Sequence, residues 1–313
     1  MLKAIIATVC ALSLVAPAWA ASEVEVEING GVGPLKGSIT WPDGNAPVPA
    51  VLILPGSGPT DRNGNAPGGL ITNAYRLIAE AFASGGTASL RIDKRGIAGS
   101  ASAMVREEEL RFETYIEDAR AWIRFLRSQK RISRIYVLGH SEGALIGSVA
   151  AQGADVAGFI SLSGAGFKAA EILRRQLAGQ IAGDLKTQAF HVLDELEAGR
   201  LVANPPPALA SLFRTSVQPY LVSWFRYDPA TEVARIKGPV MIIQGTTDLQ
   251  VTVGDARKLA AGRPDAQLRI IEGMNHVLRA ASMDRAENVA TYANPALPLK
   301  PELMPMLQAF VGR

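Results

Sequence analysis

Gly139-His140-Ser141-Glu142-Gly143 joins two apolar runs near the middle of this 313-residue sequence, and the fold is inferred from it outward. The preceding run, Arg134 to Leu138, is rich in β-branched residues and predicts a buried strand. The following run, residues 144–151, is small and apolar and predicts a buried helix. Strand, G-x-S-x-G and helix in this order are typical of a turn that presents a nucleophilic serine. The alternative is a glycine-rich turn with an incidental serine, which both flanks disfavour.

The two glycines of this motif have a steric reason. Ser141 must occupy a tight, strained turn, and a Cβ at Gly139 or Gly143 would collide with the adjoining strand or helix. The turn also moves the serine Oγ out of the sheet and places the helix N-terminus, with its unpaired N–H groups, beside the reacting carbon. We therefore predict that Ser141 is a nucleophile.

The first twenty residues have the pattern of a cleaved signal peptide. Lys3 supplies a positive charge, residues 4–15 are mostly apolar, and Ala18-Trp19-Ala20 is a small-x-small cleavage site. The apolar run is too short for a permanent spanning helix, so stable membrane insertion is not expected. We predict cleavage after Ala20 and a periplasmic or secreted protein, without disulfides because the only cysteine, Cys10, leaves with the peptide.

The charge balance does not indicate a nucleic-acid partner. The chain carries 32 Lys and Arg against 29 Asp and Glu, a formal net charge of +3, and no sustained basic run. Binding to nucleic acid or to an anionic membrane surface needs a stronger bias. No nucleic-acid partner is therefore expected, and the oligomeric state stays open.

Strand and helix patterns alternate along the sequence. An alternating polar and apolar run, Ser22 to Asn29, and its return, Leu35 to Trp41, predict an antiparallel pair. Alternation of strands with helices predicts an α/β fold, an eight-stranded mostly parallel sheet flanked by helices. The other predicted strands are 48–54, 87–92, 134–138, 156–162, 239–244 and 267–271, and the flanking helices include 74–83, 113–128 and 301–310.

The interval between the sixth and seventh strands carries no strand pattern. It contains three helical runs, 169–182, 185–196 and 208–224, with Pro205-Pro206-Pro207 before the last. A single crossover needs far fewer residues, so ordinary crossover helices explain this interval less well. We predict a helical cap (lid) at residues 167–234, inserted after strand six over the carboxyl ends of the strands. The core would then be formed by residues 21–166 and 235–313.

A serine nucleophile needs a base, and the sequence offers three histidines. His140 lies inside the tight turn, where its side chain should point away from the Ser141 Oγ. His191 falls in the middle of a predicted cap helix, which favours a solvated or packed side chain. His276 follows the eighth strand in a loop at the end of the sheet where ligands bind, so we predict it as the base.

The acid that orients the base is expected between the serine and the histidine in chain order. Asp248 closely follows the seventh strand and is our prediction. Asp255 is the second choice, because it falls in the first turn of the next predicted helix, where an acidic residue has a structural explanation. The predicted triad is thus Ser141, Asp248 and His276.

An oxyanion hole needs backbone N–H donors near the nucleophile. The N–H of Glu142 directly follows the serine, and Ser57 holds the matching position in the loop after the third strand. Three scattered histidines, and no cysteine after residue 20, do not make a ligand set, so no metal is predicted.

Four motifs together resemble bacterial EstD-like serine carboxylesterases of the α/β-hydrolase superfamily. They are residues 56–65 (GSGPTDRNGN), 93–96 (DKRG), 139–143 (GHSEG) and 245–251 (GTTDLQV). The resemblance extends over essentially all of residues 21–313. It implies the triad named above, a helical cap, no cofactor and a preference for short acyl esters.

Charged residues in two of these motifs allow two interpretations. Asp61, Arg62 and the segment Asp93-Lys94-Arg95 lie in loops that follow the third and fourth strands. They could bind an acidic group of a substrate, or they could form an ion-pair network that holds both loops beside the serine. The network is favoured, because opposite charges on adjacent loops satisfy each other first.

The pattern as a whole predicts a serine hydrolase that cleaves short-chain carboxylic esters through an acyl-enzyme intermediate, with a small-molecule ester as substrate. Two alternatives remain. The same triad would serve an amidase or peptidase acting on envelope material. A periplasmic binding protein could use a catalytically silent scaffold of this fold, but its triad would be degenerate, whereas all three members are present here.

Overall fold

One mixed sheet runs through the computed structural model, which describes residues 22–312. Its strand order is β1-β2-β4-β3-β5-β6-β7-β8; β1 pairs antiparallel with β2, β2 pairs antiparallel with β4, and every other pair is parallel. The prediction of an eight-stranded, mostly parallel sheet is confirmed. The strands are β1 (Ser22–Asn29), β2 (Pro34–Trp41), β3 (Val48–Leu54), β4 (Ala88–Ile92), β5 (Ile132–His140), β6 (Gly158–Leu162), β7 (Val240–Gly245) and β8 (Gln267–Ile271). The predicted signal peptide and its cleavage site lie outside the described residues.

The central strand β3 is apolar along its whole length because helices cover both faces of the sheet. In β3, Leu52 and Leu54 point into one hydrophobic cluster, whereas Val51 and Ile53 point into the other. This alternation follows from the two-residue period of a strand and explains why β3 carries no polar side.

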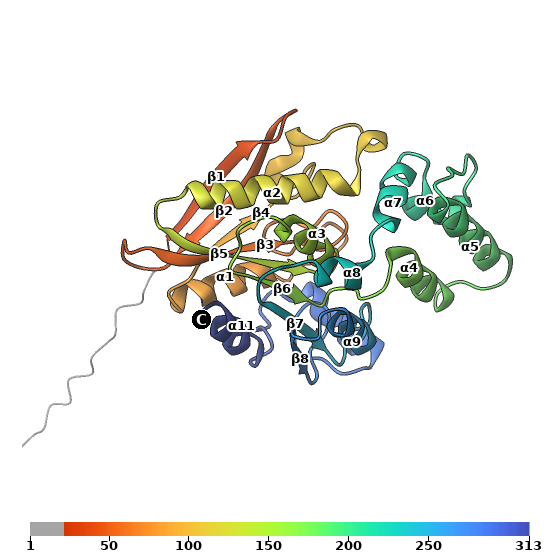
Figure 1. Ribbon diagram of the computed structural model, residues 1–313. Coiled ribbons are helices and arrows are strands. Elements are labelled where there is room, and N and C mark those ends of the chain that lie inside the picture. Colours follow the sequence, from red (N-terminus) through yellow and green to blue (C-terminus); the bar gives the residue numbers. More distant parts are fainter. Residues whose placement is uncertain (1–21, 313) are drawn as a thin grey trace, which may run out of the picture.

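Helices form a layer on each face (Figure 1). On one face lie α1 (Ala74–Ser84) and α11 (Leu303–Val311). On the other lie α2 (Phe112–Ser128), α3 (Glu142–Ala151), α8 (Pro229–Ala234) and α9 (Val253–Gly262). Short helical turns in the connecting loops are η1 (Ala98–Ala103), η2 (Glu107–Glu109), α10 (Arg285–Ala290) and η4 (Thr291–Ala293). No helix within residues 22–312 is long and apolar enough to cross a membrane.

Residues 167–234, called the inserted segment below, are helical. Besides α8 they form α4 (Ala169–Ala178), α5 (Gly183–Glu197), η3 (Pro207–Leu209), α6 (Ala210–Phe213) and α7 (Gln218–Phe225). In Figure 1, α4 to α7 (green to cyan) stand together to one side of the sheet. Their buried residues, among them Leu193 and Phe213, belong to the same hydrophobic cluster as α2 and α3.

The prediction of one helical run over 208–224 is wrong. The chain leaves the helix at Arg214, where ψ is 145°, and re-enters it at Gln218. Pro219 explains the break, because a proline inside a helix has no N–H to donate and its ring clashes with the carbonyl four residues earlier. A proline is tolerated in a first turn, which is where α7 places it.

Candidate active site

Ser141 occupies the sharp turn between β5 and α3. Its backbone has φ 55° and ψ −121°, a strained combination for a residue with a side chain. A Cβ at Gly139 would lie 2.1 Å from the carbonyl oxygen of Gly143, and a Cβ at Gly143 would lie 2.5 Å from that of Leu54. The predicted collision is confirmed for Gly139, which faces the start of α3, whereas Gly143 faces the end of β3 and not the adjoining β5 or α3.

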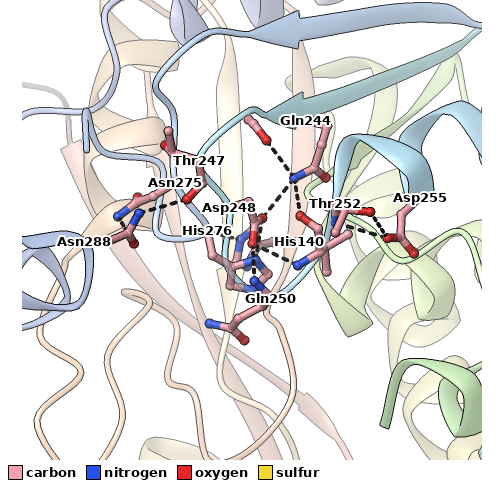
Figure 2. A network of polar contacts seen from close by, with 12 residues as sticks. His140, Gln244, Thr247, Asp248, Gln250, Thr252, Asp255, Asn275, His276 and Asn288 are labelled. Atoms are coloured by element: carbon pink, nitrogen blue, oxygen red, sulfur yellow. Dashed lines mark hydrogen bonds and ion pairs between the residues drawn. The ribbon is translucent and has the colours of Figure 1, made fainter. Parts of the chain in front are cut away.

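Asp248 and His276 are brought together by the loops after β7 and β8 (Figure 2). The Asp248 Oδ2 lies 2.8 Å from the His276 Nδ1. Its Oδ1 accepts the backbone N–H groups of Gln250 (2.8 Å) and Val251 (2.9 Å). Burial by itself raises the pKa of Asp248, but His276 and these N–H groups outweigh it, so the pKa falls below its usual value. Asp248 is thus ionised at neutral pH and can hold an imidazolium.

Two polar side chains that the sequence reasoning did not consider fix these loops. Gln244, buried at the end of β7, donates from Nε2 to Asp248 Oδ2 (3.0 Å) and to the Val251 carbonyl (2.9 Å). Asn275 donates to Asn288 Oδ1 (3.2 Å) and to Thr291 Oγ1 (2.7 Å) beside His276. Both are near neighbours of triad candidates in the chain, which was the only indication that the sequence offered.

His140 is buried beneath the site and has a positional role. Its Nε2 lies 2.9 Å from the His276 carbonyl oxygen, and its Nδ1 lies 2.8 Å from the Tyr75 hydroxyl. A carbonyl can only accept, so Nε2 carries the proton and Nδ1 accepts from Tyr75. Burial lowers the pKa of His140 to about 3. His140 is therefore neutral at physiological pH and supports the backbone of His276.

The other sequence candidates lie away from Ser141 or have structural partners. His191 is exposed on α5. Asp255 accepts the N–H of Thr252 (3.0 Å) and the N–H of Gly166 (3.0 Å), and so caps the start of α9. The structural explanation given for Asp255 is confirmed.

Ser57 and Glu142, whose N–H groups are the oxyanion-hole candidates, lie beside Ser141. Glu142 is the first residue of α3, immediately after the serine. The loop of Ser57 approaches so closely that a Cβ at Gly56 would lie 3.2 Å from the Ser141 Cβ. The structure thus brings the loop after β3 and the start of α3 to the same serine.

Two cavities meet at Ser57 and Ser141. The first, of about 240 Å³, also contains His276 and several hydroxyl groups in its wall. The second, of about 220 Å³, is mostly apolar and lies against the inserted segment. Residues of that segment in its wall are Phe167, Ala169, Ile172, Leu173, Gln176, Leu212, Trp224 and Pro229.

The charged loop residues are all engaged with protein partners. Arg62 forms a two-pronged ion pair with Asp93, 2.7 Å and 3.0 Å, which joins the loops after β3 and β4. Asp61 instead accepts the backbone N–H groups of its own loop, at Asn63 (2.8 Å) and Asn65 (2.9 Å). The pair of Arg62 and Asp93 matches the ion-pair interpretation, whereas Asp61 holds its own loop through backbone N–H groups.

The remaining two charges reach beyond the loops. Arg95 pairs with Asp118 of α2, with its Nη2 2.6 Å from Oδ1. Lys94 pairs with Glu142, with its Nζ 2.8 Å from Oε2. The predicted pairing between adjacent loops therefore holds for Arg62 and Asp93 only, and Lys94 and Arg95 bind helices α3 and α2.

A mostly parallel sheet with a strained serine between a central strand and the helix that follows it is typical of the alpha/beta hydrolase class. Residues 39–291 match the model of the Alpha/beta hydrolase family, so the chain belongs to this family. Esterase EstD of Thermotoga maritima is 28% identical over 261 residues, which cover 82% of this chain and 60% of that relative. The chain therefore spans about three fifths of the length of this curated relative.

Solved structures agree on the fold. Est1E from Butyrivibrio proteoclasticus with bound ferulic acid has a TM-score of 0.60 and 16% identity, covering 92% of this chain and 100% of its own. GrgF from Penicillium sp. sh18 has a TM-score of 0.61 and 18% identity, covering 93% and 98%. The Pyrococcus furiosus esterase Pf2001 has a TM-score of 0.58 and 17% identity, covering 94% and 93%. Identities this low support the fold alone.

Proposed function

We propose that this protein is a serine esterase that hydrolyses short-chain carboxylic esters through an acyl-enzyme intermediate. The observation that carries the proposal is the arrangement around one cavity. Ser141 and His276 share its wall, and the His276 Nδ1 lies 2.8 Å from the Asp248 carboxylate. The relationship to Esterase EstD supports an ester as the bond that is cleaved.

The proposed reaction follows from the positions of the two ring nitrogens of His276. Asp248 holds the proton on Nδ1, so Nε2 on the opposite side of the ring takes the proton of the Ser141 hydroxyl as Oγ attacks the carbonyl carbon. The backbone N–H groups of Glu142 and Ser57 stabilise the oxyanion. His276 then protonates the departing alcohol, and afterwards it activates the water that releases the acyl group.

The two cavities suggest where each half of the ester binds. The departing alcohol must lie near His276, because that residue protonates it, and His276 lines the first cavity. The acyl group then enters the apolar second cavity of about 220 Å³. A cavity of about 150 Å³ already holds benzene, so we expect acyl groups of up to about eight carbons to fit. In this proposal the inserted segment acts as a cap that sets the acyl length.

Hydrolysis of p-nitrophenyl esters from acetate to palmitate tests the proposal. We expect turnover that falls steeply beyond about eight carbons, and Ser141→Ala should lower kcat on the order of 10⁶-fold. Retention of most activity by a folded Ser141→Ala sample would exclude the serine mechanism. Faster cleavage of a matched amide than of the ester would instead indicate an amidase.

We also propose that the chain is exported and cleaved after Ala20. The proposal rests on the charge, apolar run and small-x-small site of residues 1–20. Expression in a bacterium with a periplasm, followed by fractionation and intact-mass measurement, should yield a periplasmic form that begins at Ala21. Removal of residues 1–20 should leave the protein in the cytoplasm. A full-length form found only in the cytoplasm would contradict the proposal.

A further inference from the structure

Lys94 is a buried cation beside the nucleophile to which the proposed reaction gives no role. Its side chain is 6% exposed, and its Nζ lies 4.6 Å from the centre of the Tyr115 ring. Burial by itself lowers the pKa of Lys94, but the Glu142 carboxylate and Tyr115 outweigh it and the pKa is raised. Lys94 is therefore charged at neutral pH and has three protons to donate.

The first bond of Lys94 fixes a peptide plane. Its Nζ donates to the Gly56 carbonyl oxygen at 3.2 Å. That carbonyl belongs to the same peptide unit as the N–H of Ser57, and the unit is planar and trans. In a trans peptide the C=O and the N–H point in opposite directions. A cation that holds the Gly56 carbonyl from one side therefore aims the Ser57 N–H toward the other side.

The N–H of Gly56 is held as well. It donates to the Tyr75 hydroxyl at 3.2 Å, and that hydroxyl contacts the His140 Nδ1 at 2.8 Å. The residue that precedes Ser57 is thus anchored at both its amide and its carbonyl. A donor that is already oriented needs no reorganisation when charge develops on the oxyanion, which is what makes such a donor effective.

The second bond of Lys94 reaches the residue of the other donor. Its Nζ donates to Glu142 Oε2 at 2.8 Å, and the Tyr220 hydroxyl of α7 donates to Oε1 at 2.6 Å. The carboxyl of Glu142 is buried, its side chain being 3% exposed. Both carboxylate oxygens are thereby paired, which secures the start of α3, where the N–H of Glu142 lies.

We propose that Lys94 is a positioning residue that holds the two donors of the oxyanion hole in register, through the Gly56 carbonyl on one side and the Glu142 carboxylate on the other. The proposal rests on the proposed function, since it assigns the N–H groups of Ser57 and Glu142 to the oxyanion. Lys94 acts through these groups and does not touch the substrate. The polarising effect of the cation on the Gly56–Ser57 peptide also strengthens the Ser57 N–H as a donor.

The test compares four proteins: wild type, Lys94→Met, the double variant Lys94→Met/Glu142→Gln, and Lys36→Met. The double variant removes both buried charges, and the amide that it introduces keeps an oxygen for the Tyr220 hydroxyl. Lys36→Met removes a lysine charge at a half-exposed side chain that pairs with Glu27, and serves as the control. Each protein is assayed for kcat and KM on a short ester, for thermal unfolding, and for the rate of Ser141 labelling by a fluorophosphonate.

Labelling of Ser141 by a fluorophosphonate requires the same base and oxyanion hole as ester cleavage, and it does not need the natural substrate. The serine oxygen bonds to phosphorus while His276 takes its proton, fluoride leaves, and the phosphoryl oxygen enters the oxyanion hole. Loss of one oxyanion-hole donor costs about 10²–10³-fold in comparable enzymes, and a misaligned donor should cost less. We expect Lys94→Met to lower kcat and the labelling rate constant together by about 10- to 100-fold with KM almost unchanged, as is typical of an interaction made in the transition state.

The double variant distinguishes the positioning role of Lys94 from the destabilisation caused by leaving the Glu142 carboxylate buried without its partner. We expect it to regain the thermal stability that Lys94→Met loses, because no unpaired buried charge remains, while kcat and the labelling rate stay low. Recovery of wild-type kcat in the double variant, or unchanged labelling in Lys94→Met, would overturn the positioning role alone. A wild-type protein whose Ser141 is not labelled at all would overturn the proposed function and this role with it.

Discussion

At the scale of the residue, the neighbours of His276 determine which of its two ring nitrogens carries the proton. Asp248 Oδ2 lies 2.8 Å from its Nδ1, and a carboxylate can only accept, so the proton stays on Nδ1. Nε2 is then the nitrogen with a lone pair. Two backbone N–H groups and Gln244 hold the carboxylate in place, so the acid cannot rotate away from the ring.

Asp248→Asn should therefore lower kcat by about 10⁴-fold, because the amide can donate to Nδ1 and stabilise the wrong tautomer. The measurement is kcat on a short p-nitrophenyl ester at neutral pH, with circular dichroism to show that the fold is kept. Asp255→Asn is the matched control, since Asp255 caps α9 and should affect stability alone. A near wild-type kcat in Asp248→Asn would remove Asp248 from the proposed triad.

His140 makes stability depend on pH. Its pKa falls from 6.5 to about 3 in the folded protein because burial disfavours the imidazolium. Between about pH 6.5 and 3, the unfolded chain binds a proton at residue 140 and the folded chain does not. The contribution of His140 to the free energy of unfolding is therefore fully present above about pH 6.5 and decreases as the pH falls toward 3. At about 1.4 kcal/mol per pH unit, the loss between pH 6.5 and 5 is about 2 kcal/mol.

Urea unfolding of wild type and His140→Gln, at neutral pH and at pH 5, measures this effect. The glutamine can keep a donor toward the His276 carbonyl and has no proton to gain. Wild type should lose about 2 kcal/mol more than the variant between the two conditions. Equal losses in both proteins would show that His140 is not the source of the dependence.

At the scale of elements, α7 is the helix of the inserted segment that contacts α2 and the start of α3. Phe112 of α2 stacks on Trp224 of α7, with ring centres 5.8 Å apart and planes 5° from parallel. Its N–H donates to Ser223 Oγ of the same helix at 2.8 Å. Tyr220 of α7 also donates to Glu142, so one helix contacts both α2 and the start of α3. Trp224 at the same time lines the apolar cavity.

Phe112→Ala should lower the free energy of unfolding by about 3–5 kcal/mol, because a fully buried ring leaves a cavity. It should also raise KM for butyrate and longer esters, because the packing that positions Trp224 is lost. Urea unfolding and steady-state kinetics measure the two effects. Loss of stability with an unchanged KM would mean that the α2–α7 contact does not shape the substrate site.

At the scale of the whole molecule, the sheet separates two hydrophobic clusters. Phe82 of α1 is fully buried in the cluster formed with α11, whereas Phe112 belongs to the cluster that continues into the inserted segment. The two phenylalanines are thus equivalent in size and burial but lie on opposite faces of the sheet. Only one of the clusters extends to the apolar cavity, whose wall includes Leu145 of α3.

Phe82→Ala should cost about the same 3–5 kcal/mol in the free energy of unfolding, for the same reason. Unlike Phe112→Ala, it should leave the dependence of KM on acyl length unchanged, because no residue of its cluster lines the apolar second cavity. Measuring both variants side by side distinguishes general destabilisation from a local effect on the site. An equal change of this dependence in both variants would contradict the separation of the two faces.

Local patterns in the sequence were sufficient to predict the sheet, the serine turn and the order of the site candidates. Strand periodicity, the glycines at 139 and 143, and the capping role of Asp255 all concern residues that are neighbours in the chain. The sequence did not predict the break in the helix before Pro219, because the apolar periodicity continues through it. The proline itself was the only sign of the break in the sequence.

Only the tertiary structure decided the support around the site, because its partners are far apart in the chain. The partners of Lys94, at Gly56 and Glu142, are 38 and 48 residues away, and the contact of His140 with the His276 carbonyl spans 136 residues. No pattern along the sequence indicates which buried charge or imidazole will meet which partner, since strand order and loop packing determine these pairings. The sequence determined the chemistry that the candidate residues can perform; the folding of loops from several strands into one place decided how those residues are held.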